Sequence, residues 1–238
     1  MGNIKYVLQL LIYCDKWNLT VNLDKTKIMI LNKAGRKLTR ESFLYKNNRI
    51  DLGMEYKHLV IIFKTSGIFT NAVELLCKKA TKSLFCIRQL LMSEKSNILN
   101  HLKLFETCIK PILVYCSEIW SLNIVKNNVD LESKYLSMLP VKVQIKFAKA
   151  LLGVNKQAVN LTVLGELGMY PISIHAFKLA IEFWLHILKS EDTLLYKVYE
   201  TNRSLPDSFA TRIKILLNKL HFSHVWDNQS TFSKKATS

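Results

Sequence analysis

Residues 17–31 read W-N-L-T-V-N-L-D-K-T-K-I-M-I-L, and residues 56–63 read Y-K-H-L-V-I-I-F. In the first stretch a polar turn, Asn-x-x-Lys-Thr-Lys, stands directly before a short apolar run. The second stretch opens with Tyr-Lys and closes with five apolar residues. Short apolar runs beside turn residues are typical of strands in a partly buried sheet. We therefore predict strands over residues 27–31 and 56–63.

The residues around these strands predict a helix and a hairpin. Apolar residues recur at three-to-four spacing over residues 4–17, which indicates an amphipathic helix. Residues 43–46 and 49–52 flank Asn47 and Asn48, a pair that is typical of a two-residue hairpin turn. The first 64 residues should therefore hold three or four strands beside one helix.

The rest of the chain carries the helical period. Long amphipathic helices are expected over residues 69–91 and from residue 98, and Pro111 should kink or break the second of them. The fold class is therefore α+β but mostly α. Further helices are expected over residues 130–138, 140–151, 155–164, 172–189, 193–202 and 206–220. The segments expected are 1–64 (α+β), 65–122 (helical), 123–228 (a C-terminal helical bundle) and 229–238 (a frayed tail).

The chain is strongly basic, with a formal net charge of +16 over 238 residues. Residues 1–118 hold 19 Lys and Arg against 9 Asp and Glu, and residues 119–238 hold 15 against 9. A surface of this charge attracts polyanions by releasing their counterions. Because Lys predominates over Arg, contact with nucleic-acid backbone is expected rather than base recognition. A lysine-rich composition without any such partner is the alternative.

Cysteine and histidine usage predicts a reduced, metal-free protein. The five cysteines form no Cys-x-x-Cys pair, which favours buried thiols in an intracellular protein, either cytoplasmic or nuclear. His221 and His224 have the spacing of a metal pair, but neither a cysteine nor another histidine lies close to them in sequence. No metal site is therefore expected. Without an apolar run of 18 residues, no membrane partner is expected either.

Three blocks of sequence resemble one family. The blocks are Trp17, Leu19, Val21, Asn22 and Lys25-Thr26-Lys27; Tyr56-Lys57-His58-Leu59; and Ile109-Lys110-Pro111-Ile112-Leu113 with Tyr115 and Trp120. With these blocks the chain resembles the end of the palm and the thumb of a reverse transcriptase from a non-LTR (LINE-type) retrotransposon, over about residues 1–122. The resemblance implies a small palm-sheet remnant, a helical thumb and a helical C-terminal region.

The family pattern implies roles for several residues. Lys25, or less favourably Lys27, would lie near the leaving pyrophosphate, where a lysine can stabilise developing phosphate charge. A solvated turn lysine is the interpretation we prefer for Lys25. Tyr56, Lys57 and Leu59 would belong to the primer grip. The family usually has Gly after this Leu, whereas this chain has Val60, which indicates drift or repurposing.

The same resemblance places basic residues of the expected helix 69–91 toward the nucleic-acid duplex. These residues are Lys78, Lys79, Lys82 and Arg88. The alternative is an ordinary charged face in contact with solvent. Binding by these residues would be weak and non-specific, to RNA or DNA backbone.

The polymerase chemistry of the family is not expected of this chain. The complete family enzyme uses Mg²⁺ held by carboxylates, but no Tyr/Phe-x-Asp-Asp motif or other Asp-Asp pair occurs in the sequence. We therefore expect a reverse-transcriptase fragment with no catalytic residues and no cofactor. It could pair with a separately encoded palm half. The alternatives are a host-recruited helical interaction module and a pseudogene product without a selected function.

Overall fold

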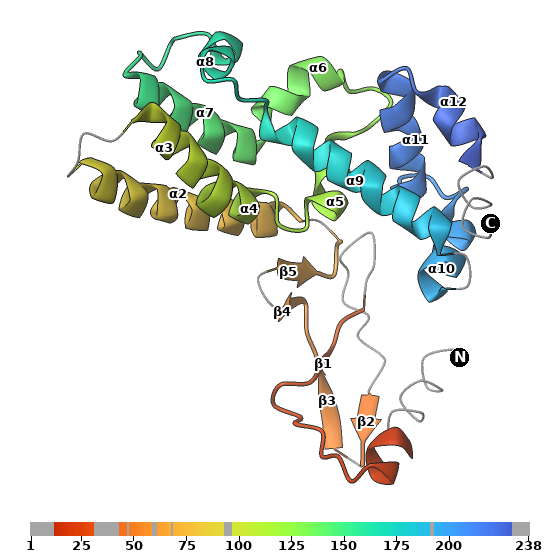
Figure 1. The fold of residues 1–238 in the computed structure, drawn as a ribbon. Helices are drawn as coiled ribbons and strands as arrows, with labels where there is room; N and C mark the ends of the chain where they lie inside the picture. The colour runs from red at the N-terminus through yellow and green to blue at the C-terminus, as the bar shows by residue number, and fades with distance from the viewer. Residues whose placement is uncertain are drawn as a thin grey trace. The chain divides into compact units, whose positions relative to one another are not determined.

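The computed structural model describes residues 12–30, 43–46, 48–58, 61–67, 69–92, 97–190 and 193–229. The chain divides into two compact units, residues 1–72 and 73–238. All strands of the described residues lie in the first unit, and helices build the second (Figure 1). The predicted class, α+β but mostly α, is thus confirmed at this coarse level.

The first unit holds two small sheets rather than one. In the three-stranded sheet β3 lies in the middle, parallel to β1 and antiparallel to β2, and β4 and β5 form a separate antiparallel pair. The five strands exceed the three or four predicted. They are β1 (Lys27–Ile28), β2 (Phe43–Tyr45), β3 (Asn48–Leu52), β4 (Glu55–His58) and β5 (Ile61–Lys64).

The predicted single strand over residues 56–63 is wrong, because the chain reverses within it. Tyr56 pairs with Phe63, and His58 pairs with Ile61. All four residues of β4 are exposed, whereas β5 is partly buried. The connecting residues 59 and 60 are Leu and Val, which are not turn formers, so no local signal predicts the reversal. Both lie outside the described residues.

The other predictions for the first unit need smaller corrections. The hairpin over 43–52 is confirmed, but Tyr45 pairs with Asn48, so the turn begins at Lys46 and not at residue 47. Lys46 has a left-handed φ of 44° and forms an ion pair with Asp15 at 2.5 Å. The strand predicted over 27–31 is limited to β1, and residue 31 is not described. Of the helix predicted over 4–17, residues 12–16 are helical and 4–11 are not described.

The second unit follows the predicted helical order. The helix predicted over 155–164 begins only at residue 160, and α12 was not predicted. The elements are α2 (Thr70–Met92), which starts in the first unit, α3 (Ile98–Leu104), η1 (Phe105–Ile109), α4 (Lys110–Leu113), α5 (Ser117–Trp120), η2 (Ser121–Ile124), α6 (Leu131–Lys134), η3 (Tyr135–Ser137), α7 (Leu139–Leu152), α8 (Asn160–Glu166), α9 (Ile172–Lys189), α10 (Leu194–Asn202), α11 (Phe209–Lys219) and α12 (Ser223–Asp227).

Helix α9 forms the centre of the second unit. It contacts α5, α7, α10 and α11, and it runs between them in Figure 1. Ala176, Ala180 and Trp184 are completely buried on it. The Trp184 ring stacks on Trp226 with centroids 5.6 Å apart, and its Nε1 donates to the Tyr199 hydroxyl at 3.0 Å. Small residues and one fixed aromatic thus hold several helices against α9.

Pro111 changes the local helix type instead of bending a uniform helix. The segment η1 before it is a π-helix, in which the Lys110 N–H donates to the Phe105 carbonyl five residues back. A proline has no N–H, and its ring clashes with the carbonyl four residues earlier. Widening the helix by one residue relieves that clash. The predicted kink or break is therefore a π segment followed by the short helix α4.

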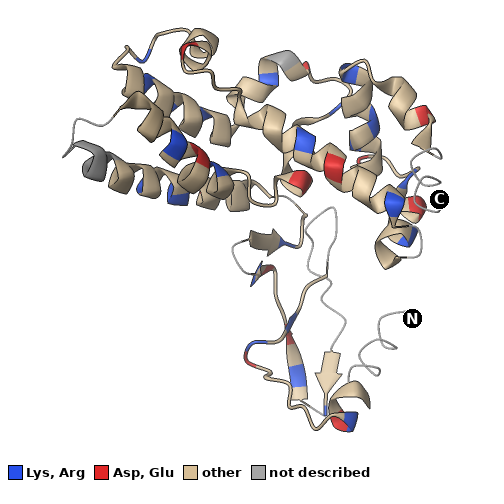
Figure 2. Cartoon of the chain, in the orientation of Figure 1, with Lys and Arg blue, Asp and Glu red and all other residues tan. Residues whose placement is uncertain are grey.

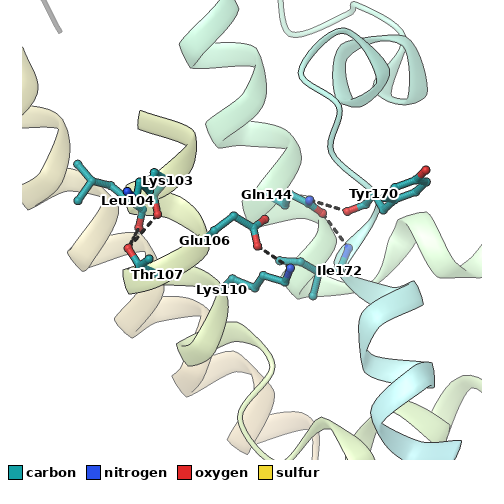
Figure 3. A network of polar contacts seen from close by, with 8 residues as sticks. All are labelled: Lys103, Leu104, Glu106, Thr107, Lys110, Gln144, Tyr170 and Ile172. Carbon is teal, nitrogen blue, oxygen red and sulfur yellow. Dashed lines mark hydrogen bonds and ion pairs between the residues drawn. The ribbon is translucent and has the colours of Figure 1, made fainter. Parts of the chain in front are cut away.

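A buried glutamine joins α7 to the start of α9 (Figure 3). The Gln144 amide donates from Nε2 to the Tyr170 carbonyl, and its Oε1 accepts from the Ile172 N–H, both at 2.9 Å. Ile172 is the first residue of α9, and no side chain of the preceding residue caps this helix. Gln144 therefore satisfies one of the N–H groups that every helix start leaves without a partner.

Replacing Gln144 with Leu should destabilise the protein by about 1–3 kcal/mol, because the buried Ile172 N–H loses its acceptor. Urea unfolding of the variant and the wild type measures the difference. Gln157→Leu is the matched control, since Gln157 is exposed and should change stability by less than about 0.5 kcal/mol. Equal losses in both variants would show that the Gln144 hydrogen bonds do not stabilise the fold.

Candidate nucleic-acid interface

The Asn-x-x-Lys-Thr turn of the first unit is built by its own motif residues. The Lys25 N–H donates to Asn22 Oδ1 at 3.2 Å. The Thr26 N–H and hydroxyl both donate to the Asn22 carbonyl, at 3.0 and 2.7 Å. Such side-chain bonds to nearby backbone are what make Asn and Thr good turn residues. The turn thereby leaves the Lys25 side chain exposed to solvent.

Lys27 follows this turn, and its side chain lies near the backbone that precedes β4. It is exposed and lies on β1, in register with Asp51 of β3. A Cβ added at Gly53 would lie 3.5 Å from Lys27 Cδ and 3.4 Å from the Glu55 carbonyl oxygen. The aliphatic stem of Lys27 therefore passes beside the backbone that leads into β4.

The residues predicted for a primer grip are only partly described. Tyr56 and Lys57 are exposed on β4, and the Tyr56 ring stacks with His58 at 6.5 Å between centroids. Leu59 lies outside the described residues. Close to this pair, Glu55 forms an ion pair with Lys64 at 2.9 Å. Lys25, Lys27, Tyr56 and Lys57 thus lie on one unit as exposed side chains.

The predicted lysines of the second unit surround an open hollow on α2. Lys78, Lys79 and Lys82 are all exposed, and the hollow has a volume of about 650 Å³. Residues three and four apart on a helix lie on one side of it, which brings these lysines together. The side chain of Arg88 is outside what the structure describes. The α2 hollow is lined by Glu74, Leu75, Cys77, Lys78, Lys79, Thr81, Lys82 and Leu139.

Cys77 in the α2 hollow is not a nucleophile at neutral pH. Burial, and to a lesser extent the Glu74 carboxylate, raises the pKa of its thiol to about 11. The thiol therefore stays protonated, and only a thiolate reacts readily. The expectation of buried thiols holds for Cys77 and Cys14, but Cys86 and Cys108 are exposed.

A second basic hollow was missed by the sequence analysis. It lies along α7, has a volume of about 750 Å³, and is lined in part by Lys142, Lys146, Lys149 and Lys156. A signal for it exists, since residues 133–165 contain five lysines and no Asp or Glu. Figure 2 shows basic residues on α2 and α7. This hollow is called the α7 hollow below.

The described residues contain no cluster of the kind that a two-metal polymerase site uses. A two-metal site needs converging carboxylates. No group of three or more His, Cys, Asp or Glu side chains that could hold a metal ion occurs among the described residues. The sequence as a whole has no Asp-Asp pair. The lysines that line both hollows can bind anions through their ammonium groups.

Comparison with models of protein families, with curated proteins and with solved structures gives no match to this chain. The resemblance to a reverse transcriptase accordingly stays a prediction. Within the part of the chain that the structure describes, no helix has both the length and the apolar character needed to cross a membrane.

The Asn22→Ala substitution should open the turn that presents Lys25. The Lys25 N–H loses its side-chain acceptor, so its amide hydrogen should exchange faster with solvent. The Thr26 N–H should stay protected, since it bonds to the backbone carbonyl of residue 22. Hydrogen exchange followed by NMR measures both amides. Asn22→Asp, which keeps an acceptor oxygen, is the control, and an unchanged Lys25 exchange rate in the Ala variant would contradict the described turn.

Proposed function

We propose that this chain is a segment of a retrotransposon-type reverse transcriptase, comprising the end of the palm, the thumb and the helices that follow. Its own activity is weak, sequence-tolerant binding to the phosphate backbone of RNA or DNA. The three exposed lysines of the α2 hollow carry this proposal. They lie on the helix that the family pattern assigns to the thumb, and they present their charge on one side of it.

The charge balance of the α2 hollow supports an anionic partner. Glu74 is the only acid among its lining residues, against Lys78, Lys79 and Lys82. Among the described residues, no ion pair joins these lysines to a carboxylate. Exposed ammonium groups gain little from single contacts, but several together displace counterions from a nucleic-acid backbone.

The first unit supports the family assignment through its turn. Asn22 and Thr26 hold the turn closed, and Lys25 is left free to meet solvent or a ligand. That arrangement gives a structural reason for the Asn-x-x-Lys-Thr pattern on which the resemblance depends. The recruited interaction module and the product without a selected role stay as alternative hypotheses.

No DNA synthesis is expected from this chain alone. Because the sequence has no Asp-Asp pair, template-primer extension with Mg²⁺ or Mn²⁺ should not exceed the background of a mock preparation. Sustained nucleotide incorporation by the purified chain would overturn the assignment of a non-catalytic segment. A complete reverse transcriptase in parallel reactions shows that the template and primer are competent.

Charge reversal of the α2 lysines tests the binding face. The variant Lys78→Glu, Lys79→Glu, Lys82→Glu should bind single-stranded oligonucleotide at least tenfold more weakly than a control with three other lysines reversed. Its slope of log affinity against log salt should fall by about 0.7 for each lost phosphate contact. Fluorescence anisotropy at several salt concentrations measures both quantities.

The control variant is Lys126→Glu, Lys189→Glu, Lys197→Glu. These lysines are exposed and change the net charge by the same amount. Lys219 is unsuitable as a control because its ammonium donates to the carbonyls of Asn127 and Val129. Equal loss of affinity in the two variants would mean that general positive charge binds the oligonucleotide and that no α2 binding face exists.

A further inference from the structure

The α7 hollow is formed by an amphipathic helix and the loop that follows it. Lys142, Lys146 and Lys149 stand at positions i, i+4 and i+7, and so lie on one side of α7. Val141, Ile145 and Ala148 are buried. After the helix ends at Gly153, whose φ is 66°, Lys149 Nζ donates to the Lys156 carbonyl at 2.6 Å. This bond holds the loop against α7 and adds Lys156 to the same hollow.

Lysines predominate among the described residues that line the α7 hollow. Those residues are four lysines with Ser133, Leu136, Ser137, Ile145, Ala150, Val154 and Asn160, and no described Asp or Glu is among them. A third hollow, of about 430 Å³, lies on another side of α7, where Gln144 is found. There Lys110 pairs with Glu106 at 2.6 Å (Figure 3), and Lys178 pairs with Glu182 at 3.6 Å. That hollow is nearly neutral, so the α7 hollow is the stronger anion site.

The α2 and α7 hollows are lined by neighbouring residues at the first turn of α7. Leu139 lines the α2 hollow, and Lys142 lines the α7 hollow. Residues three apart on a helix have Cβ atoms about 5–6 Å from each other. Both hollows belong to the second unit, so their adjacency is fixed within one compact body.

We propose that the two hollows form one basic track, along which a single nucleic-acid strand lays its phosphate backbone from α2 to the end of α7. The inference rests on the proposed function, because it extends the α2 binding face. Lys142, Lys146 and Lys156 contact phosphates directly. Lys149 positions Lys156 through its bond to the loop.

The dimensions and chemistry of the track fit a polyanion. Lys142 and Lys149 are about 10 Å apart along the helix axis at 1.5 Å per residue, which is about three times the 3.4 Å axial spacing of phosphates along one strand of double-stranded DNA. A small anion would be held by a few converging, buried donors, whereas these lysines are mostly exposed. The described residues that line the α7 hollow include no aromatic side chain, so they offer bases no ring to stack on. Backbone contact without base preference follows.

The experiment compares the variant Lys142→Glu, Lys146→Glu, Lys156→Glu with the α2 variant and with the control variant described above. The probe is a fluorescent oligothymidylate of about 20 nucleotides, longer than the 4–16 that a single binding groove often covers. The α7 variant should bind at least tenfold more weakly than the control, with a salt slope lower by about 2 for three lost contacts. Wild type should bind one strand per protein molecule in a stoichiometric titration.

Each result separates the hypotheses. If the α2 variant binds the probe more weakly while the α7 variant binds it as tightly as the control variant, the track is overturned and the proposed function stands. If both variants bind as tightly as the control variant, or if the wild type does not bind, the track and the proposed function are both overturned. Two strands bound per protein overturn the single track. Polyglutamate at equal charge concentration is also added as a competitor. If it displaces the probe as effectively as unlabelled oligothymidylate does, the α7 hollow binds acidic peptides, and the nucleic-acid track is overturned.

Misfolding of the variants can be excluded as the cause of weaker binding. The three reversed lysines of the α7 hollow are exposed, and circular dichroism should show unchanged helix content. The variant Lys142→Gln, Lys146→Gln, Lys156→Gln adds no new acid and should still lower the salt slope by about 2. If this variant has the same salt slope as the wild type, these lysines do not contact phosphates.

Discussion

Burial of α9 is the constraint on which the second unit depends. This 18-residue helix is amphipathic, and its buried residues include Ala176, Ala180 and Trp184. The apolar side of such a helix must be enclosed by other elements, while Lys178 and Glu182 stay exposed on its other side. α5, α7, α10 and α11 supply that enclosure. The Tyr199 hydroxyl accepts from Trp184 and donates to Gln229 Oε1 at 2.8 Å, so the polar groups of these two aromatic side chains have partners inside the core.

The position of the basic surface follows from this packing. α7 contacts α9 and stacks Phe147 on Phe105 of η1, with centroids 4.6 Å apart. Gln144 fixes the rotation of α7 through its bonds to the start of α9. With these residues held inward, the helical period places Lys142 and Lys146 outward. The same argument holds for α2, where buried Leu76 and Ala80 leave Lys78, Lys79 and Lys82 exposed. The cationic faces are therefore fixed by the apolar core and need no contact of their own.

Sequence reasoning succeeded where local signals were complete and failed where pairing decided the outcome. The helix over 172–189 was predicted at both ends, because a long apolar period follows a proline and stops before a polar loop. The β4–β5 reversal was missed because Leu59 and Val60 carry no turn signal. Pro111 indicated that the helix is interrupted. The π segment itself depends on how the chain relieves the clash between the proline ring and the carbonyl four residues earlier. The lysines of the α7 hollow lie outside residues 1–122, which the three blocks of the family pattern cover. Their adjacency to α2 through Leu139 is a tertiary contact that no local pattern contains.

The type of cation sets what such a surface can recognise. Lysine offers a compact, strongly hydrated charge on a flexible stem, whereas arginine offers a planar fork that matches base edges. Both hollows present lysine side chains, and no arginine or aromatic ring is among their described lining residues. Their attraction to nucleic acid would arise mainly from counterion release, which is insensitive to sequence and weakens steeply with salt. Long strands gain more than short ones, because each added phosphate can meet another lysine. A segment with this surface is suited to holding a strand in place, and selection of a particular sequence would have to come from another part of the protein or from the pairing of the nucleic acid itself.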